Sequence, residues 1–166
     1  MHQLVLGGAR SGKSAYAEAQ AAASRQRLVY LATAEAGDAE MAQRIAHHRS
    51  GRDPGWLTVE EPLALAAQLA ALNEAHNHIV VDCLTLWLSN CLATGCWEQQ
   101  REALLALLPE VRATLYLVSN EVGSGVVPLG ELSRRFVDES GRLHQQLATH
   151  CDRVTLVVAG LPLTLK

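Results

Sequence analysis

One short glycine-rich stretch near the N-terminus constrains the fold of this chain more than any other feature. Residues 7–14 read Gly-Gly-Ala-Arg-Ser-Gly-Lys-Ser, a complete match to the pattern G-x-x-x-x-G-K-[ST] of phosphate-binding loops (P-loops). An apolar run at Gln3–Leu6 precedes it and a helical pattern begins near Lys13, which is the context that such a loop requires. A chance glycine-rich turn is the alternative, and this context argues against it.

The P-loop pattern predicts a nucleoside triphosphate site with defined roles. Its backbone N–H groups and the following helix N-terminus would hold the phosphates. Lys13 would bridge the β- and γ-phosphates, and Ser14 would place its hydroxyl on Mg²⁺. The predicted nucleotide-binding residues of the loop are Gly7, Gly8, Ala9, Arg10, Ser11, Gly12, Lys13 and Ser14.

Short apolar runs alternate with helical patterns along the chain, which is typical of a parallel sheet covered by helices. We therefore expect one domain over residues 1–166 with an α/β, RecA-like P-loop NTPase fold: a mostly parallel central sheet with helices on both faces. The predicted strands are Gln3–Leu6, Leu28–Thr33, Ile79–Cys83, Leu115–Asn120 and Arg153–Ala159, with shorter ones at Leu57–Val59 and Pro162–Leu165. The predicted helices are Ser14–Ser24, Ala39–Arg49, Glu61–Glu74 with Pro62 in its first turn, Leu84–Ala93, Glu98–Arg112 and Leu129–His150.

Composition excludes several classes of function. A net charge of −3 gives no basic surface for nucleic acid, so we expect no nucleic-acid partner. No apolar stretch reaches the roughly 18 residues of a membrane span, and no signal-peptide pattern precedes the P-loop. The four cysteines show no C-x-x-C pairing, so a zinc site or disulfide framework is not expected. We expect a cytoplasmic protein with thiols that are buried or idle.

An acidic residue at the end of a second apolar strand is the candidate metal partner of the P-loop. Asp82 follows Ile79-Val80-Val81, where a buried strand would meet the active edge. A P-loop needs such a carboxylate for its magnesium ion, so we expect Ser14 and Asp82 to hold Mg²⁺. A cap for the following helix is the alternative role of Asp82.

A second cluster combines arginines and histidines on or just after the predicted Ala39–Arg49 helix. Three arginines beside two imidazoles would form an anion site with a nucleophile in it. A basic helix end that only complements the helix dipole is the alternative, and composition alone favours it. The cluster consists of Arg44, His47, His48, Arg49 and Arg52.

A glycine-containing loop follows the strand at Leu115–Asn120. It spans Asn120–Pro128 and lies at the same predicted sheet edge as the P-loop and Asp82. We interpret it as a substrate-facing loop, with a plain connection as the alternative. Its candidate residues are Asn120, Glu121, Gly123 and Gly125.

Several of these segments together resemble one family, the bifunctional adenosylcobinamide kinase / adenosylcobinamide-phosphate guanylyltransferase of cobalamin biosynthesis. Beyond the generic P-loop, the stretches Arg-Ile-Ala-His-His-Arg at 44–49 and Asn-Glu-Val-Gly at 120–123 are specific to it. The other matching stretches are Tyr30–Thr33, Glu40–Arg52, Trp56–Glu61, Val81–Asn90, Asn120–Pro128 and Val157–Pro162, in order over essentially the whole chain.

The resemblance implies two reactions. The aminopropanol hydroxyl of adenosylcobinamide takes the γ-phosphate of GTP or ATP; a histidine then attacks the α-phosphate of GTP and carries GMP to adenosylcobinamide-phosphate. By the family pattern the histidine is His48, with His47 as the fallback. The implied nucleotide contacts outside the P-loop are Ala32, Thr33, Ala34, Arg44, Arg49, Ser50, Gly51, Arg52 and, at the guanine, Glu60 or Glu61.

One departure from the family pattern falls in the last long helix. Where Gly-x-x-Asn-Gln is expected, the chain has Gly141-Arg142-Leu143-His144-Gln145, so a contact of that asparagine is in doubt. The resemblance also implies a homotrimer. The P-loop alone would equally suit a nucleotide switch or an ATPase without a small-molecule acceptor.

Overall fold

A computed structural model describes residues 1–34 and 55–166 of the chain. Its described residues form a seven-stranded sheet whose strands confirm the predicted ones to within two residues at either end. The strands are β1 (His2–Gly7), β2 (Arg27–Ala32), β3 (Trp56–Glu60), β4 (Asn77–Asp82), β5 (Thr114–Asn120), β6 (Arg153–Val158) and β7 (Leu161–Thr164).

The order of the strands brings three strand ends to one edge. The sheet runs β3-β2-β4-β5-β1-β6-β7, parallel except for the antiparallel hairpin of β6 and β7. β5 therefore lies between β1, which leads into the P-loop, and β4, which ends at Asp82. This order confirms the predicted mostly parallel central sheet.

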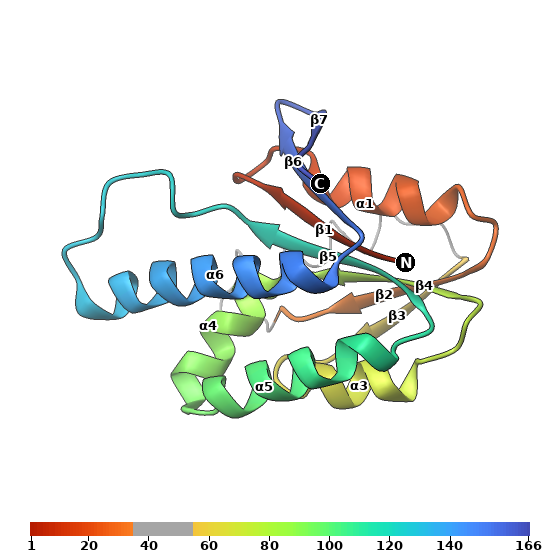
Figure 1. Ribbon diagram of the computed structural model, residues 1–166, viewed down its shortest axis with the longest axis horizontal. Helices are drawn as coiled ribbons and strands as arrows, with labels where there is room; N and C mark the ends of the chain where they lie inside the picture. The colour runs from red at the N-terminus through yellow and green to blue at the C-terminus, as the bar shows by residue number, and fades with distance from the viewer. Residues whose placement is uncertain (35–54) are drawn as a thin grey trace.

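Helices cover both faces of the sheet, as predicted (Figure 1). α1 (Lys13–Ala22) packs on one face, and α3 (Leu65–Ala71), α4 (Leu84–Thr94), α5 (Trp97–Leu107) and α6 (Glu131–His150) lie on the other. The predicted Ala39–Arg49 helix lies outside the described residues.

Two predicted helices differ most from the structure, because both are clearly shorter than expected. Pro62 does not lie in the first turn of a helix, because α3 begins only at Leu65. The Glu61 carboxylate instead accepts hydrogen bonds from the amides of Leu63 and Ala64, at 2.9 and 2.7 Å, in the turn before α3. The predicted Glu98–Arg112 helix ends as α5 at Leu107, and a 3₁₀ turn containing a proline follows it at Leu108–Glu110.

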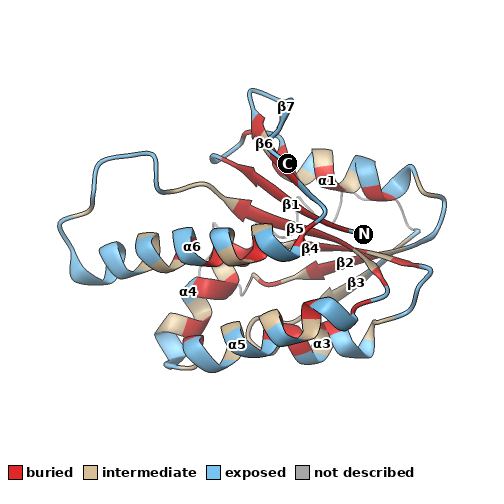
Figure 2. Ribbon diagram, in the orientation of Figure 1, coloured by how far each residue is buried: buried red, intermediate tan, exposed pale blue. Residues whose placement is uncertain are grey.

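The alternation of side chains along the strands builds a separate core on each face of the sheet. Leu4 and Leu6 join the larger cluster beneath α3, α4, α5 and α6, whereas Val5 joins the smaller one beneath α1. Trp87 and Trp97 stack edge to face in the larger core, with ring centroids 5.3 Å apart. Buried residues accordingly concentrate along the central strands and the inner sides of the helices (Figure 2). The sheet is therefore packed on both faces by a hydrophobic cluster, and this packing fixes the positions of the strand ends.

Two further findings concern the helices and the cysteines of the described residues. None of these helices is both long and apolar enough to cross a membrane. All four cysteines are free thiols, and Cys83, Cys91 and Cys151 are buried.

Candidate functional site

The P-loop connects β1 to α1 in a conformation that requires glycine at two positions. A Cβ atom at Gly7 would lie 2.4 Å from the Ser11 hydroxyl oxygen and 2.6 Å from the Val157 carbonyl oxygen. Gly12 has φ +93°, in the left-handed region that residues with a side chain avoid. The glycines of the sequence pattern therefore shape the loop itself.

The turn between β6 and β7 supports the P-loop from the side. The Gly160 amide donates a hydrogen bond of 2.8 Å to the Ser11 carbonyl oxygen. The Ser11 hydroxyl is buried and has no hydrogen-bond partner among the described residues. Because buried hydroxyls normally find partners, Ser11 is available to a bound anion.

Lys13 provides the positive charge of the loop. Its side chain is only 8% exposed, and its ammonium group donates a hydrogen bond of 3.1 Å to the Gly8 carbonyl oxygen. The lysine thus reaches back across its own loop, where a bound phosphate could replace the carbonyl as its partner.

The predicted metal partner lies two strands away from the P-loop strand. Asp82 ends β4, and the Tyr30 hydroxyl donates a hydrogen bond of 2.9 Å to its Oδ2 atom. The described residues contain no group of three or more His, Cys, Asp or Glu side chains that could hold a metal. One serine hydroxyl and one carboxylate suit Mg²⁺, which is usually bound by one or two protein groups together with phosphates and water.

The loop that follows β5 starts beside the P-loop. The Asn120 amide donates to the Thr85 hydroxyl, and the Glu121 amide donates to the Gly7 carbonyl oxygen, both at 3.1 Å. Since β5 separates β1 from β4, Asn120 and Glu121 lie between the P-loop and the end of the Asp82 strand. Gly123 and Gly125 are exposed further along the loop.

The Glu121 carboxylate is held in its ionised form. Burial opposes ionisation, but hydrogen bonds from the Ser124 hydroxyl and from the amides of Gly123 and Ser124 outweigh it and lower the pKa of Glu121. The bond from the Gly123 amide is 2.8 Å long. The site edge therefore carries a fixed negative charge next to Gly7.

The histidine that departs from the family pattern faces the same edge. His144 Nε2 lies 2.7 Å from the Ser119 hydroxyl oxygen, one residue before Asn120. Burial lowers the pKa of His144, and the nearby Glu121 only partly offsets this effect. A neutral imidazole therefore lies where the sequence resemblance led us to expect asparagine. Sequence reasoning noted the substitution but had no signal that α6 carries it to β5.

Two of the predicted nucleotide contacts, Thr33 and Glu61, use their side chains for hydrogen bonds within the chain. The Thr33 hydroxyl donates to the Cys83 carbonyl oxygen and accepts from the Cys83 amide, at 2.7 and 2.9 Å, which ties the end of β2 to that of β4. The Glu61 carboxylate holds the turn before α3. Ala32 pairs in register with both Asp82 and Glu60.

The second cluster predicted from the sequence lies outside the described residues. It comprises Arg44, His47, His48, Arg49 and Arg52, and the implied nucleotide contacts Ser50 and Gly51 lie outside the described residues as well. The structure therefore places the P-loop, Asp82 and the Asn120–Glu121 segment together. Residues that sequence reasoning missed are Tyr30 and Thr85, both of which contact members of this group.

Comparisons with known proteins give a consistent result over the whole chain. One family model, described as cobinamide kinase / cobinamide phosphate guanyltransferase, matches residues 3–165. The bifunctional adenosylcobalamin biosynthesis protein CobP of Pseudomonas aeruginosa is 58% identical over 169 residues, covering 100% of this chain and 98% of that protein. The protein CobU of Escherichia coli, with the same description, is 38% identical over 179 residues and covers 98% of both.

Solved structures with a similar arrangement are more distant. A KaiC-like protein, PH0186, from Pyrococcus horikoshii is 17% identical with a TM-score of 0.49, covering 93% of this chain and 69% of that one. The RadB recombinase is 16% identical with a TM-score of 0.48, covering 93% and 73%.

Proposed function

Because the chain belongs to the cobinamide kinase / cobinamide phosphate guanyltransferase family, we propose that it carries out both reactions of cobalamin biosynthesis for which that family is named. The first would phosphorylate the aminopropanol hydroxyl of adenosylcobinamide with GTP or ATP. The second would join GMP from GTP to the phosphate so formed. The observation that carries the proposal is a complete P-loop, shaped by Gly7 and Gly12, within a chain that the family model matches from residue 3 to 165.

The geometry of the P-loop edge supports the kinase half. Lys13, the hydroxyl of Ser11 and the loop amides would bind the β- and γ-phosphates, and Ser14 with Asp82 would hold Mg²⁺, which neutralises the charge of those phosphates. The acceptor oxygen would attack the γ-phosphorus while the bond to the nucleoside diphosphate breaks. Asn120 and Glu121 follow β5 beside the P-loop, and from there they would orient the acceptor hydroxyl.

The guanylyl half rests on the sequence. We propose that an imidazole nitrogen of His48, with His47 as the fallback assignment, attacks the α-phosphorus of GTP and expels pyrophosphate. A phosphate oxygen of the acceptor would then displace the imidazole and take GMP. Arg44, Arg49 and Arg52 would bind the phosphates and stabilise the developing charge.

Labelled GTP tests the two halves separately. With GTP labelled at the α-phosphate, the protein should carry label that acid removes and base does not, and His48→Ala should abolish it. Label kept at full level after both His47 and His48 are replaced would contradict the histidine intermediate. His47→Ala, with His48 intact, is the matched control.

The kinase half is tested with GTP labelled at the γ-phosphate. Lys13→Ala should reduce transfer to adenosylcobinamide by roughly 10²–10³-fold, the range seen when one preorganised charge partner is lost. Nucleotide hydrolysis without any transfer to the corrinoid would instead favour a switch or ATPase.

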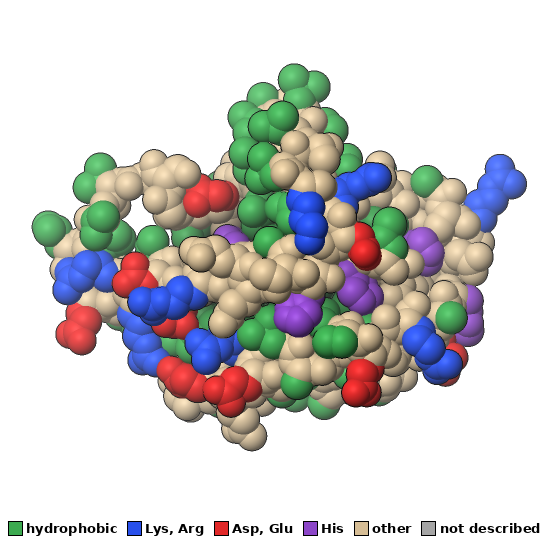
Figure 3. All heavy atoms as spheres, in the orientation of Figure 1, with side chains coloured by type: hydrophobic (Ala, Val, Ile, Leu, Met, Phe, Trp, Pro, Cys, Tyr) green, Lys and Arg blue, Asp and Glu red, His purple; other side chains and the backbone are tan. Residues whose placement is uncertain are grey.

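We further propose a homo-oligomer, in keeping with the trimer that the sequence resemblance implies. Apolar side chains gather on the β6–β7 hairpin at the top of Figure 3, where Leu161, Leu163 and Leu165 are 55–72% exposed. A second copy of the chain would cover this surface, because exposed apolar patches commonly mark interfaces. The cytoplasmic location stays a prediction.

A further inference from the structure

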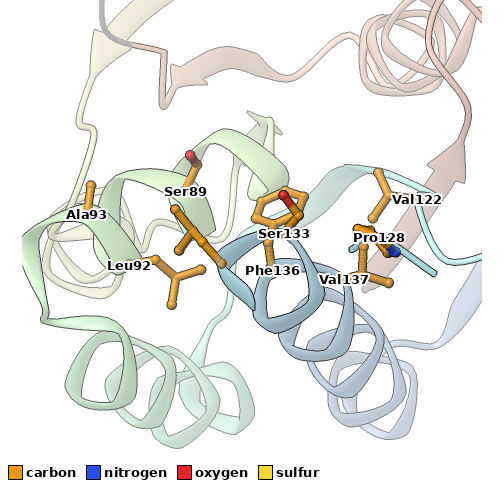
Figure 4. Close-up of a pocket in the computed structure, with 9 residues that line it drawn as sticks. Ser89, Leu92, Ala93, Val122, Pro128, Ser133, Phe136 and Val137 are labelled. Carbon is orange, nitrogen blue, oxygen red and sulfur yellow. The ribbon is translucent and has the colours of Figure 1, made fainter. Parts of the chain in front are cut away.

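A cavity of about 460 Å³ lies between α4, α6 and the loop that follows β5 (Figure 4). This volume falls within the range of roughly 300–1,000 Å³ that is typical of small-molecule sites. The side chains of the cavity come from both helices and from the loop. Apolar walls are formed by Leu92, Phe136, Val137 and Pro128, and the hydroxyls of Ser89 and Ser133 also line it.

The cavity begins next to the P-loop edge. Val122, which lines it, directly follows Glu121, whose amide is bonded to the Gly7 carbonyl oxygen. On the opposite wall, Ser89 follows Thr85 by one helical turn of about 6 Å, and the Thr85 hydroxyl accepts from Asn120. Both walls therefore start from residues that contact the site edge. A ligand in the cavity could extend a flexible arm to the phosphates.

The side chains that line the cavity indicate which kind of ligand it could bind. The described residues that line the cavity carry no charged side chain, so phosphates or a carboxylate would gain no ionic partner there. Apolar surface with two hydroxyl groups suits a neutral ligand that bears methyl groups and amides. A corrin ring has such a periphery, and its aminopropanol arm is the part that must reach the P-loop.

We propose that this cavity binds the methyl- and amide-bearing edge of the corrin ring of adenosylcobinamide, with the aminopropanol arm running past Val122 to the P-loop. The inference rests on the proposed function, which supplies the corrinoid acceptor. Further apolar surface extends the cavity outward for a ring larger than the cavity itself. Leu132, at its rim, is 68% exposed, and Val126 and Leu129 in the adjoining loop are 96% and 97% exposed.

Filling the cavity tests the proposal. Ser89 is exposed at the cavity wall, so Ser89→Trp adds bulk without removing a core contact. It should raise the KM for adenosylcobinamide at least about tenfold, equivalent to about 1.4 kcal/mol, and leave corrinoid-independent guanylylation from GTP unchanged. Thr94→Trp is the matched control, because it adds the same side chain to an exposed position of α4 outside the cavity.

Leu132→Asp is the second variant, since it puts a charge at the exposed rim. It should weaken corrinoid binding in equilibrium dialysis and leave the oligomeric state unchanged. If light scattering shows that Leu132→Asp alters the oligomeric state, the cavity belongs to an interface between copies and the proposal is overturned. Normal corrinoid affinity in a folded Ser89→Trp protein would also overturn it.

Hydrogen exchange of the unaltered chain gives a measurement that does not depend on any variant. Adenosylcobinamide should slow amide exchange in the first turns of α6 and in residues 122–128 and leave β7 unaffected. Protection confined to other segments would overturn the cavity assignment. A wild-type chain that neither binds nor phosphorylates adenosylcobinamide would refute the proposed function itself, which is a distinguishable failure.

Discussion

Replacing Gly7 by alanine should destabilise the fold, because the new methyl group has no space. The nearest neighbours of its Cβ would be the Ser11 hydroxyl oxygen at 2.4 Å and the Val157 carbonyl oxygen at 2.6 Å. Ser11 could rotate its side chain away. Val157 cannot yield in this way, since it belongs to β6 and pairs in register with Gly7 itself. Relief therefore requires a shift between two central strands.

The expected cost follows from that geometry. Forcing one extra methyl group into a filled space typically costs about 1–3 kcal/mol. For a chain of this size each kcal/mol lowers the melting temperature by about 2–4 °C, so Gly7→Ala should melt about 2–12 °C lower than the wild type. Nucleotide affinity should fall as well, because the displaced strand end carries the P-loop.

Gly8→Ala provides the matched control for stability. A Cβ atom at Gly8 would meet no atom within 4 Å, so its effect on the free energy of unfolding should stay within about 0.5 kcal/mol. Thermal melts without nucleotide, followed by circular dichroism, measure both variants. Equal melting temperatures for Gly7→Ala and the wild type, or equal losses in the two variants, would refute the steric argument.

Three further variants test other parts of the site and surface. Tyr30→Phe removes the hydroxyl that orients Asp82, a bond worth roughly 0.5–1.5 kcal/mol. It should raise the Mg²⁺ concentration needed for half-maximal kinase activity by about 2–13-fold. Tyr116→Phe, whose activity should keep its Mg²⁺ dependence, is the control. His144 has a pKa lowered by burial, so the unfolded chain binds its proton more readily and the wild type should lose stability as the pH falls below 6.5. His144→Asn should reduce that loss in melts at several pH values, and an unchanged pH slope would contradict it. Leu163→Asp should dissociate the oligomer in light scattering, and an unchanged mass would exclude β7 from the interface.

The strands and the P-loop could be predicted from the sequence because each leaves a local pattern. The apolar run at Gln3–Leu6 and the glycine spacing after it determine both β1 and the loop within a dozen residues. Asp82 could be assigned to a strand end in the same way. The P-loop and Asp82 thus both had signals in consecutive residues.

Contacts between distant segments left no such signal. The sequence resemblance implied that Thr33 contacts the nucleotide, but its hydroxyl bonds to Cys83, fifty residues away. The helix expected from Glu61 starts late because Glu61 uses its carboxylate in the preceding turn, a competition that helical periodicity does not report. The hydrogen-bond partners of these two side chains depend on which groups the fold brings close to them, and the local sequence does not contain that information.

The strand order explains why one small edge could serve both acceptor binding and phosphate transfer. β5 separates the P-loop strand from the Asp82 strand, so the residues that follow β5 contact the P-loop through Glu121 and α4 through Asn120. The same segment then forms one wall of the apolar cavity at Val122. A change at the end of β5 should therefore affect both acceptor binding and phosphate transfer, whereas a change at Ser89 should affect only the first. That difference separates the binding role of the cavity from the chemistry of the loop.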